Sequence, residues 1–220
     1  MTTRIVSGID GAAAATGVVV VIDVLRAFTT AAYAFAAGID ELELVATIED
    51  AFAASGFRMG EVGGRLIPGF DHNNSPSQLI GRRLAGRAVL RTSSGTRCVV
   101  AATQAREVWL GSLVVASATA RALADRDEVT FVASGSPKEG EEDIACAELI
   151  AALLQGARHS GDAAVAAVAG SRAAARHRSD DADFPMEDVN CAVAIDAFDF
   201  AMKTERQGGR VIARPFLSRS

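Results

Sequence analysis

The segment Thr92-Ser93-Ser94-Gly95-Thr96-Arg97 groups hydroxyls, a glycine and a cation where a strand is expected to give way to a helix. Backbone N–H groups at such a turn can cradle an anion, and an arginine adds charge-assisted hydrogen bonds to phosphate oxygens. Serine and threonine are also the ordinary residues at helix N-caps. On spacing alone, the segment therefore fits an anion site and a capped helix equally well.

Acidic residues follow other expected strands and could provide oxygen ligands for a metal ion. Asp23 ends the most apolar run of the sequence, where a carboxylate could bind a metal, act as a nucleophile or pair with Arg26. Glu61 precedes a Gly-rich loop and has the oxygen chemistry that Mg²⁺ prefers. Glu142 and Asp143 open a later helix, where acidic side chains usually complement the helix dipole, so both roles remain open.

The Gly-, Pro- and Asn-rich loop over 62–74 carries further polar candidates. Asp71 is another oxygen ligand, and Asn74 and Ser75 could donate to a phosphate. Ser75 followed by proline is also a typical helix start, which predicts a helix from about residue 75. His159 and His177 lie in weakly patterned stretches, and we interpret both as surface residues.

The apolar pattern predicts the elements that must position these groups. The run over 17–23 is continuous and rich in valine, which is typical of a central strand buried on both faces. Further strands are expected over 41–46, 57–61, 88–92, 107–111 and 128–134, with helical stretches between them. Polar residues follow the ends of five expected strands: Asp23, Glu61, Thr92-Ser93-Ser94, Ser112 and Ser134-Gly135-Ser136. The carboxyl ends of strands in open sheets are where ligands bind, so we expect a site at this edge.

The C-terminal third has a less regular pattern. It predicts an Ala-rich helix over 161–178, an amphipathic helix over 187–202 and an edge strand over 210–213. The alternation of strands and helices predicts an α/β fold: a layered α/β/α domain with a largely parallel or mixed central sheet. A single domain over residues 1–220 is sufficient for a chain of this length.

Composition excludes several classes of function. The net charge of −5 argues against nucleic acid or an anionic membrane as the main partner. The apolar run over 12–22 is too short to span a bilayer, so we expect no membrane association. Three isolated cysteines, none in a CxxC pair, favour a reducing cytoplasmic location over a disulfide framework or a zinc site.

Taken together, the motifs resemble the 2-phosphosulfolactate phosphatase family (ComB-like proteins). The matching pieces are Val21-Ile22-Asp23-Val24-Leu25-Arg26-Ala27 with Thr29-Thr30, Gly60-Glu61, Gly69-Phe70-Asp71 with Asn74-Ser75-Pro76, Gly95-Thr96-Arg97, and Glu142-Asp143 before Cys146-Ala147. The resemblance implies an α/β fold particular to that family, Mg²⁺ dependence and a homo-oligomer. It also implies hydrolysis of a phosphomonoester on a small sulfonated or carboxylated acid.

The resemblance suggests a role for each candidate. In this hypothesis the phosphoryl oxygens are held by Ser94, Gly95, Thr96 and Arg97, with Arg26 as a second cation. Mg²⁺ is held by Glu61, Glu142 and Asp143, with Asp23 as nucleophile, general base or further ligand. Asp71, Asn74 and Ser75 orient water or the leaving oxygen. Because Val62, Ser94 and Val115 depart from the family pattern, the alternative is a catalytically inactive anion-binding module on the same fold.

Overall fold

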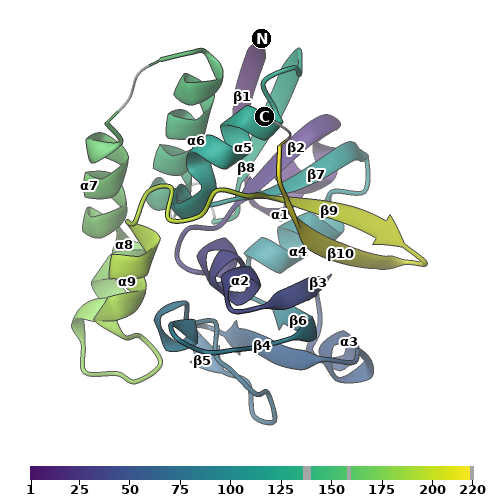
Figure 1. The fold of residues 1–220 in the computed structure, drawn as a ribbon, viewed down its shortest axis with the longest axis vertical. Coiled ribbons are helices and arrows are strands. Elements are labelled where there is room, and N and C mark those ends of the chain that lie inside the picture. The colour runs from purple at the N-terminus through teal and green to yellow at the C-terminus, as the bar shows by residue number, and fades with distance from the viewer. Residues whose placement is uncertain (136–139, 158–159, 219–220) are drawn as a thin grey trace.

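The computed structural model describes residues 1–135, 140–157 and 160–218, so His159 lies outside the described part. Within these residues, ten strands form a sheet in the order β1-β8-β2-β7-β9-β10-β3-β6-β4-β5. Helices cover the sheet, which confirms the predicted layered α/β fold (Figure 1). The expectation of a single domain over the whole chain stays a prediction.

The sheet consists of two parallel groups that a hairpin joins. The first group contains β1 (Thr2–Ser7), β8 (Glu128–Ala133), β2 (Gly17–Ile22) and β7 (Ala105–Gly111). The second contains β3 (Ile39–Val45), β6 (Gly86–Arg91) and β4 (Phe57–Val62), with the short β5 (Arg65–Leu66) antiparallel at its edge. The hairpin of β9 (Ala201–Gln207) and β10 (Arg210–Phe216) pairs antiparallel with β7 on one side and β3 on the other.

Helices fill the space between the two groups and cover their outer faces. Between the groups lie α1 (Gly8–Ala14), α2 (Ala27–Ala36) and α4 (Gly95–Ala101), the last two in the middle of Figure 1. The outer face of the first group is covered by α5 (Ala116–Ala122), α6 (Glu141–Leu154) and α7 (Asp162–Gly170). On the second group, α3 (Ile48–Ala53) packs against β3 and β6.

The burial of strand β2 explains why its sequence is almost entirely valine. Val19 and Val21 belong to the core cluster around α2 and α4, whereas Val18, Val20 and Ile22 belong to the cluster around α5 and α6. Both faces of the strand are therefore buried, as the continuous apolar run predicted. This burial fixes the end of β2, and with it Asp23, in the centre of the fold.

Several predicted elements differ from the structure. The expected helix over 187–202 is wrong: α9 (Met186–Ala192) ends early and β9 begins at Ala201. Strand β10 is not an edge strand, because β9 and β3 flank it. The helix expected from residue 75 is only the 3₁₀ turn η1 (Ser77–Leu79), and β1 and α1 were not predicted.

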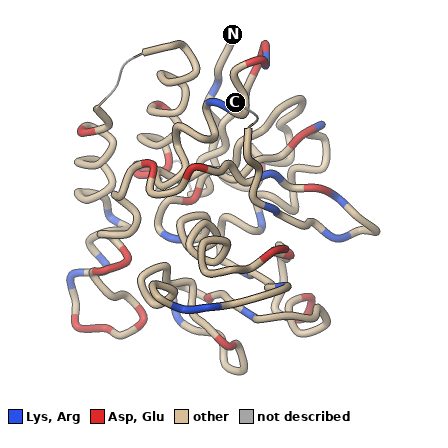
Figure 2. Tube along the Cα trace, in the orientation of Figure 1, with Lys and Arg blue, Asp and Glu red and all other residues tan. Residues whose placement is uncertain are grey.

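The Ala-rich stretch after α7 is broken into short pieces. Ser171 accepts a hydrogen bond from the Ala174 N–H and starts α8 (Arg172–Ala175), which runs into the 3₁₀ turn η3 (Arg176–Arg178). Acidic and basic residues follow one another along this part of the chain (Figure 2). No helix among the described residues combines the length and apolar character that crossing a membrane requires.

Candidate functional site

The ends of β2, β4, β6 and β8 meet at one cleft, which the segment over 172–184 borders. The cleft contains two hollows of about 130 and about 360 Å³, which suit a small molecule. Both hollows are lined by Asp23, Leu25, Ser94, Ala173 and Arg176. Asp23 is thus the acidic side chain that the two hollows share.

Asp23 is held in place by three donors from three elements. One carboxylate oxygen accepts from the Ala27 N–H at 2.9 Å, and the other accepts from the Gly95 N–H and the Ser134 hydroxyl, each at 3.0 Å. Burial raises the pKa of the Asp23 carboxyl above its ordinary value, and the nearby Glu61 charge adds to the rise, against these hydrogen bonds. The carboxyl is therefore both rigidly placed and poorly solvated.

Asp143 and Glu142, at the start of α6, line the second hollow beside Asp23. Asp143 accepts from the N–H groups of Val24, Ser134 and Gly135, so it ties the loops after β2 and β8 together. Burial raises its pKa well above the ordinary value, and the charges of Asp23 and Glu142 add to the rise. Burial likewise raises the pKa of Glu142 to about 7, helped by the charge of Asp23.

Glu61 joins the second strand group to the site. Its carboxylate accepts from the Ser93 N–H at 2.6 Å, the Ser93 hydroxyl at 3.0 Å and the Gly64 N–H at 2.5 Å. It lines the first hollow, whereas Glu142 and Asp143 line the second. The three acids expected to hold a metal ion are therefore divided between the two hollows.

The loop over 92–97 contributes less to the cleft than its sequence suggested. The Ser93 N–H donates to Glu61, the Gly95 N–H to Asp23 and the Thr96 N–H to the Thr92 hydroxyl. Ser94 lines both hollows, while Thr96 is fully buried and bonded within the loop. Arg97 is exposed on α4 and lines neither hollow.

The remaining predicted residues form the floor of the site or lie outside it. Arg26 is buried and donates to Asp188 at 2.7 Å and to the carbonyls of Asp183 and Gly64. Ser75 is fully buried and also donates to Asp188, at 2.8 Å, which anchors α9 beneath the cleft.

Asn74 and Asp71 end up in different surroundings although they are three residues apart. Asn74 lines the first hollow, and its buried Oδ1 has no hydrogen-bond partner among the described residues. Asp71 is exposed and accepts from the Arg58 N–H at 2.8 Å, so it stabilises the loop beside β4 rather than the cleft.

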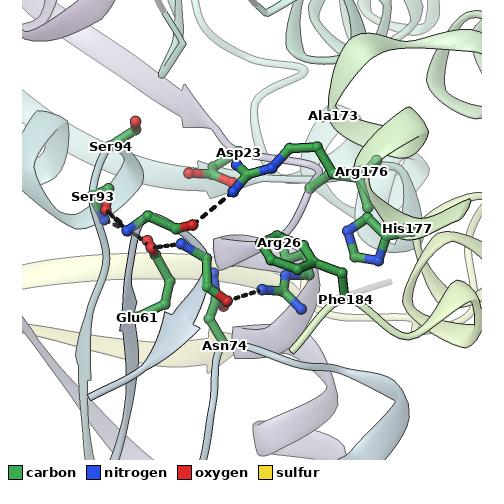
Figure 3. Close-up of a pocket in the computed structure, with 13 residues that line it drawn as sticks. Asp23, Arg26, Glu61, Asn74, Ser93, Ser94, Ala173, Arg176, His177 and Phe184 are labelled. Atoms are coloured by element: carbon green, nitrogen blue, oxygen red, sulfur yellow. Dashed lines mark hydrogen bonds between the residues drawn. The ribbon is translucent and has the colours of Figure 1, made fainter. Parts of the chain in front are cut away.

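Two residues that sequence reasoning missed lie over the cleft, on η3. Figure 3 shows the Arg176 side chain extended across the first hollow toward Asp23. Its guanidinium donates to the Gly63 carbonyl at 2.6 Å and stacks 4.4 Å above the Phe184 ring. His177, interpreted as a surface residue, is only 4% exposed and lines the same hollow. The cationic run Arg176-His177-Arg178, which interrupts an Ala-rich stretch, was the available signal.

Comparison with known proteins identifies one matching family. The sequence profile of the 2-phosphosulpholactate phosphatase family matches residues 4–205, nearly the whole chain. The chain belongs to this family. All four strands whose ends form the cleft, and α6 with its two acids, lie inside the matched region.

Relatives in this family come from several bacteria, and each is named a probable 2-phosphosulfolactate phosphatase. The Bacillus subtilis protein is 34% identical over 146 residues, covering 62% of this chain and 64% of the relative. The Deinococcus radiodurans protein is 43% identical, covering 62% and 61%, and the Carboxydothermus hydrogenoformans protein is 40% identical, covering 62% and 60%. The alignments thus span somewhat less than two thirds of these relatives.

Phosphatases commonly use a divalent cation, and the carboxyl groups of the cleft have the oxygen chemistry that binds such an ion. Asp23, Glu142 and Asp143 are buried carboxyls whose pKa values are all raised, first by burial and also by neighbouring carboxylates. Within the described residues, no three His, Cys, Asp or Glu side chains are placed to hold an ion together. A divalent ion that takes one or two carboxylates, with water and substrate phosphate completing its shell, suits this set.

Proposed function

We propose that this chain hydrolyses the phosphate monoester of a small carboxylated or sulfonated acid, with Mg²⁺ as its metal ion. The observation that carries the proposal is the position of Asp23, buried between two small hollows with other carboxyls around it and Arg176 above it. Family membership supports the reaction class. Because the curated relatives are matched over less than two thirds of their length, activity and substrate are part of the proposal.

Arg176 takes the role in this proposal that the sequence suggested for Arg97. It lines both hollows, and it has no carboxylate partner among the described residues, so its charge is available to an anionic ligand. Arg26, by contrast, is neutralised by Asp188 at 2.7 Å. Arg176 and the Ser94 hydroxyl hold the phosphoryl oxygens through charge-assisted and neutral hydrogen bonds.

Glu142 and Asp23 are the residues that would hold Mg²⁺, because both line the second hollow and the charge of Asp23 reaches Glu142. Glu61 lines only the first hollow, and Asp143 accepts from three backbone N–H groups. When bound, the ion would neutralise charge on the phosphoryl oxygens in a cleft otherwise rich in carboxylates. Asp143 and Glu61 act as positioning residues that fix the loops around Asp23. Gly95 lets the Asp23 carboxylate approach α4 closely, since a Cβ there would lie 2.6 Å from Asp23 Oδ2.

The reaction is an in-line exchange of oxygen at phosphorus. Water forms a new P–O bond, the ester P–O bond breaks, and one proton of the water ends on the leaving alcohol. The products are inorganic phosphate and a hydroxy acid. Phosphoryl transfer needs mainly positioning and charge stabilisation from the protein, which a rigid carboxylate set and the Arg176 guanidinium provide.

The isolated cysteines favour a cytoplasmic location and the family resemblance implies a homo-oligomer, and both are part of the proposal. The competing function is an anion-binding module without turnover, favoured by the lack of a ready-made three-carboxylate metal site among the described residues. Phosphate release from small 2-phospho acids with Mg²⁺ separates the two. Turnover that EDTA abolishes supports the proposal, whereas thermal stabilisation by phosphate without any turnover supports the binding module.

A further inference from the structure

His177 has a fixed tautomer. Its ring Nδ1 lies 2.8 Å from the Pro185 carbonyl oxygen, which can only accept, so Nδ1 carries the proton and donates. The ring also packs edge-to-face against Phe184, with centroids 5.5 Å apart. One nitrogen is thus committed to the backbone, and the orientation of the ring is set by packing and by that hydrogen bond.

The other ring nitrogen, Nε2, belongs to a side chain that lines the first hollow. Among the described residues Nε2 has no hydrogen-bond partner. It is also absent from the set of polar atoms that are both unpartnered and fully buried, so a small molecule in the hollow can reach it. Because the rest of the side chain is almost completely buried, the small accessible part of His177 is where the ring meets the hollow (Figure 3). Water can donate to an accessible lone pair in the free protein, and a ligand that displaces this water keeps the hydrogen bond only if it brings a donor of its own.

The charges around the ring decide which donor fits. Burial lowers the pKa of His177, and the Arg26 and Arg176 charges lower it further, against the Pro185 hydrogen bond and the Asp188 charge. The ring is therefore neutral at pH 8, and Nε2 is an acceptor. A carboxylate or sulfonate has no hydrogen to donate. A neutral hydroxyl can donate to Nε2 without adding a charge beside Arg176 or beside the carboxylates of the same hollow.

We propose that His177 is a specificity-determining residue that accepts a hydrogen bond from a free hydroxyl of the substrate. The substrate class is then a phosphorylated carboxylic acid that carries a second, unphosphorylated hydroxyl, rather than one that carries a sulfonate at that place. This inference rests on the proposed function, because it concerns the same cleft. It adds a residue and a chemical group that the family resemblance does not assign.

Three matched compounds test the proposal. 2-Phosphoglycerate, 2-phospholactate and 2-phosphosulfolactate share the phosphate and carboxylate, and carry a hydroxyl, a hydrogen and a sulfonate on C3. At pH 8 with Mg²⁺, we expect kcat/KM for 2-phosphoglycerate to exceed that for 2-phospholactate by about tenfold, which corresponds to about 1.4 kcal/mol. The sulfonated compound is expected to be no better than 2-phospholactate.

Substitution of His177 assigns the preference to this ring. In His177→Phe, which keeps the aromatic packing, the ratio of kcat/KM for 2-phosphoglycerate to kcat/KM for 2-phospholactate should fall to about one. Arg178→Ala, on the same turn but outside both hollows, should keep the tenfold ratio. Circular dichroism checks that each variant is folded.

Different outcomes overturn different claims. Turnover of none of the three compounds by the wild-type protein overturns the proposed function and this inference together. Turnover without a preference for 2-phosphoglycerate, or with a preference for the sulfonated compound, overturns the inference alone. If His177→Phe still prefers 2-phosphoglycerate over 2-phospholactate, His177 is not the residue that recognises the hydroxyl. Because the wild-type ratios need no variant, the inference stays testable if His177→Phe does not fold.

Discussion

Glu142 is a carboxyl whose burial should cost the protein stability, and its replacement by glutamine measures that cost. Burial raises its pKa from 4.5 to about 7, and the charges of Asp23 and Glu141 add to the rise. The side chain is only 7% exposed. Glu142→Gln keeps the shape of the side chain and removes the titrating group, so it isolates the electrostatic penalty.

The sign of the effect follows from proton binding. As the pH rises from about 4.5 to 7, the unfolded chain releases the Glu142 proton while the folded chain keeps it, so rising pH favours unfolding. The folded protein therefore begins to lose stability near pH 4.5, and this loss is complete above pH 7. A pKa difference of this size corresponds to at most about 3 kcal/mol, and relaxation around the site reduces the expected effect to about 1–2 kcal/mol.

Urea unfolding in the presence of EDTA provides the assay. We expect Glu142→Gln to be more stable than wild type by about 1–2 kcal/mol at pH 8 and to lose this advantage at pH 5. Glu148→Gln, at an exposed position of the same helix, is the matched control and should show no such pH dependence. A glutamine variant whose stability relative to wild type is the same at both pH values would refute the reasoning.

Three further predictions concern the cation above the cleft, the glycine beside Asp23 and the buried ion pair. Arg176→Ala should lower kcat/KM for 2-phospholactate about 100-fold, while Arg97→Ala changes it less than about threefold; equal effects in steady-state kinetics would contradict the assignment. Gly95→Ala places a methyl group 2.6 Å from Asp23 Oδ2, so we expect at least a tenfold loss of activity with an unchanged circular dichroism spectrum. Unaltered turnover would show that Asp23 can shift freely. Asp188→Asn weakens the buried pair with Arg26 and should lower the free energy of unfolding by about 3–5 kcal/mol in urea, an effect that a solvent-screened pair would not show.

Local sequence pattern predicted the centre of the fold well. The valine run of β2 predicted a strand buried on both faces. The polar residues after β2, β4, β6 and β8 lie at the cleft, whereas Ser112, after β7, is fully buried and lines neither hollow. The reason is that burial on two faces constrains every residue of such a strand, so its composition has little freedom.

Residues whose position depends on distant contacts were not predictable in this way. Arg97 follows the loop as expected, but Thr96, Cys98 and Val99 face the core, so the helix turns Arg97 outward. Arg176 and His177 reach the cleft because the ion pair between Asp188 and Arg26 anchors their segment. These two paired residues are 162 positions apart in the sequence. Strand β10 is central because β3 provides an open edge, which no local pattern of residues 210–213 reveals.

The most direct test of the proposed function is phosphate release from 2-phospholactate by the wild-type protein and by Asp23→Asn, each with Mg²⁺ and with EDTA. We predict turnover by the wild-type protein that EDTA abolishes and Mg²⁺ restores, and a loss of at least about 1,000-fold in Asp23→Asn without loss of fold. Turnover that persists in EDTA would contradict the metal. Undiminished turnover by Asp23→Asn would contradict the placement of the reaction between the two hollows.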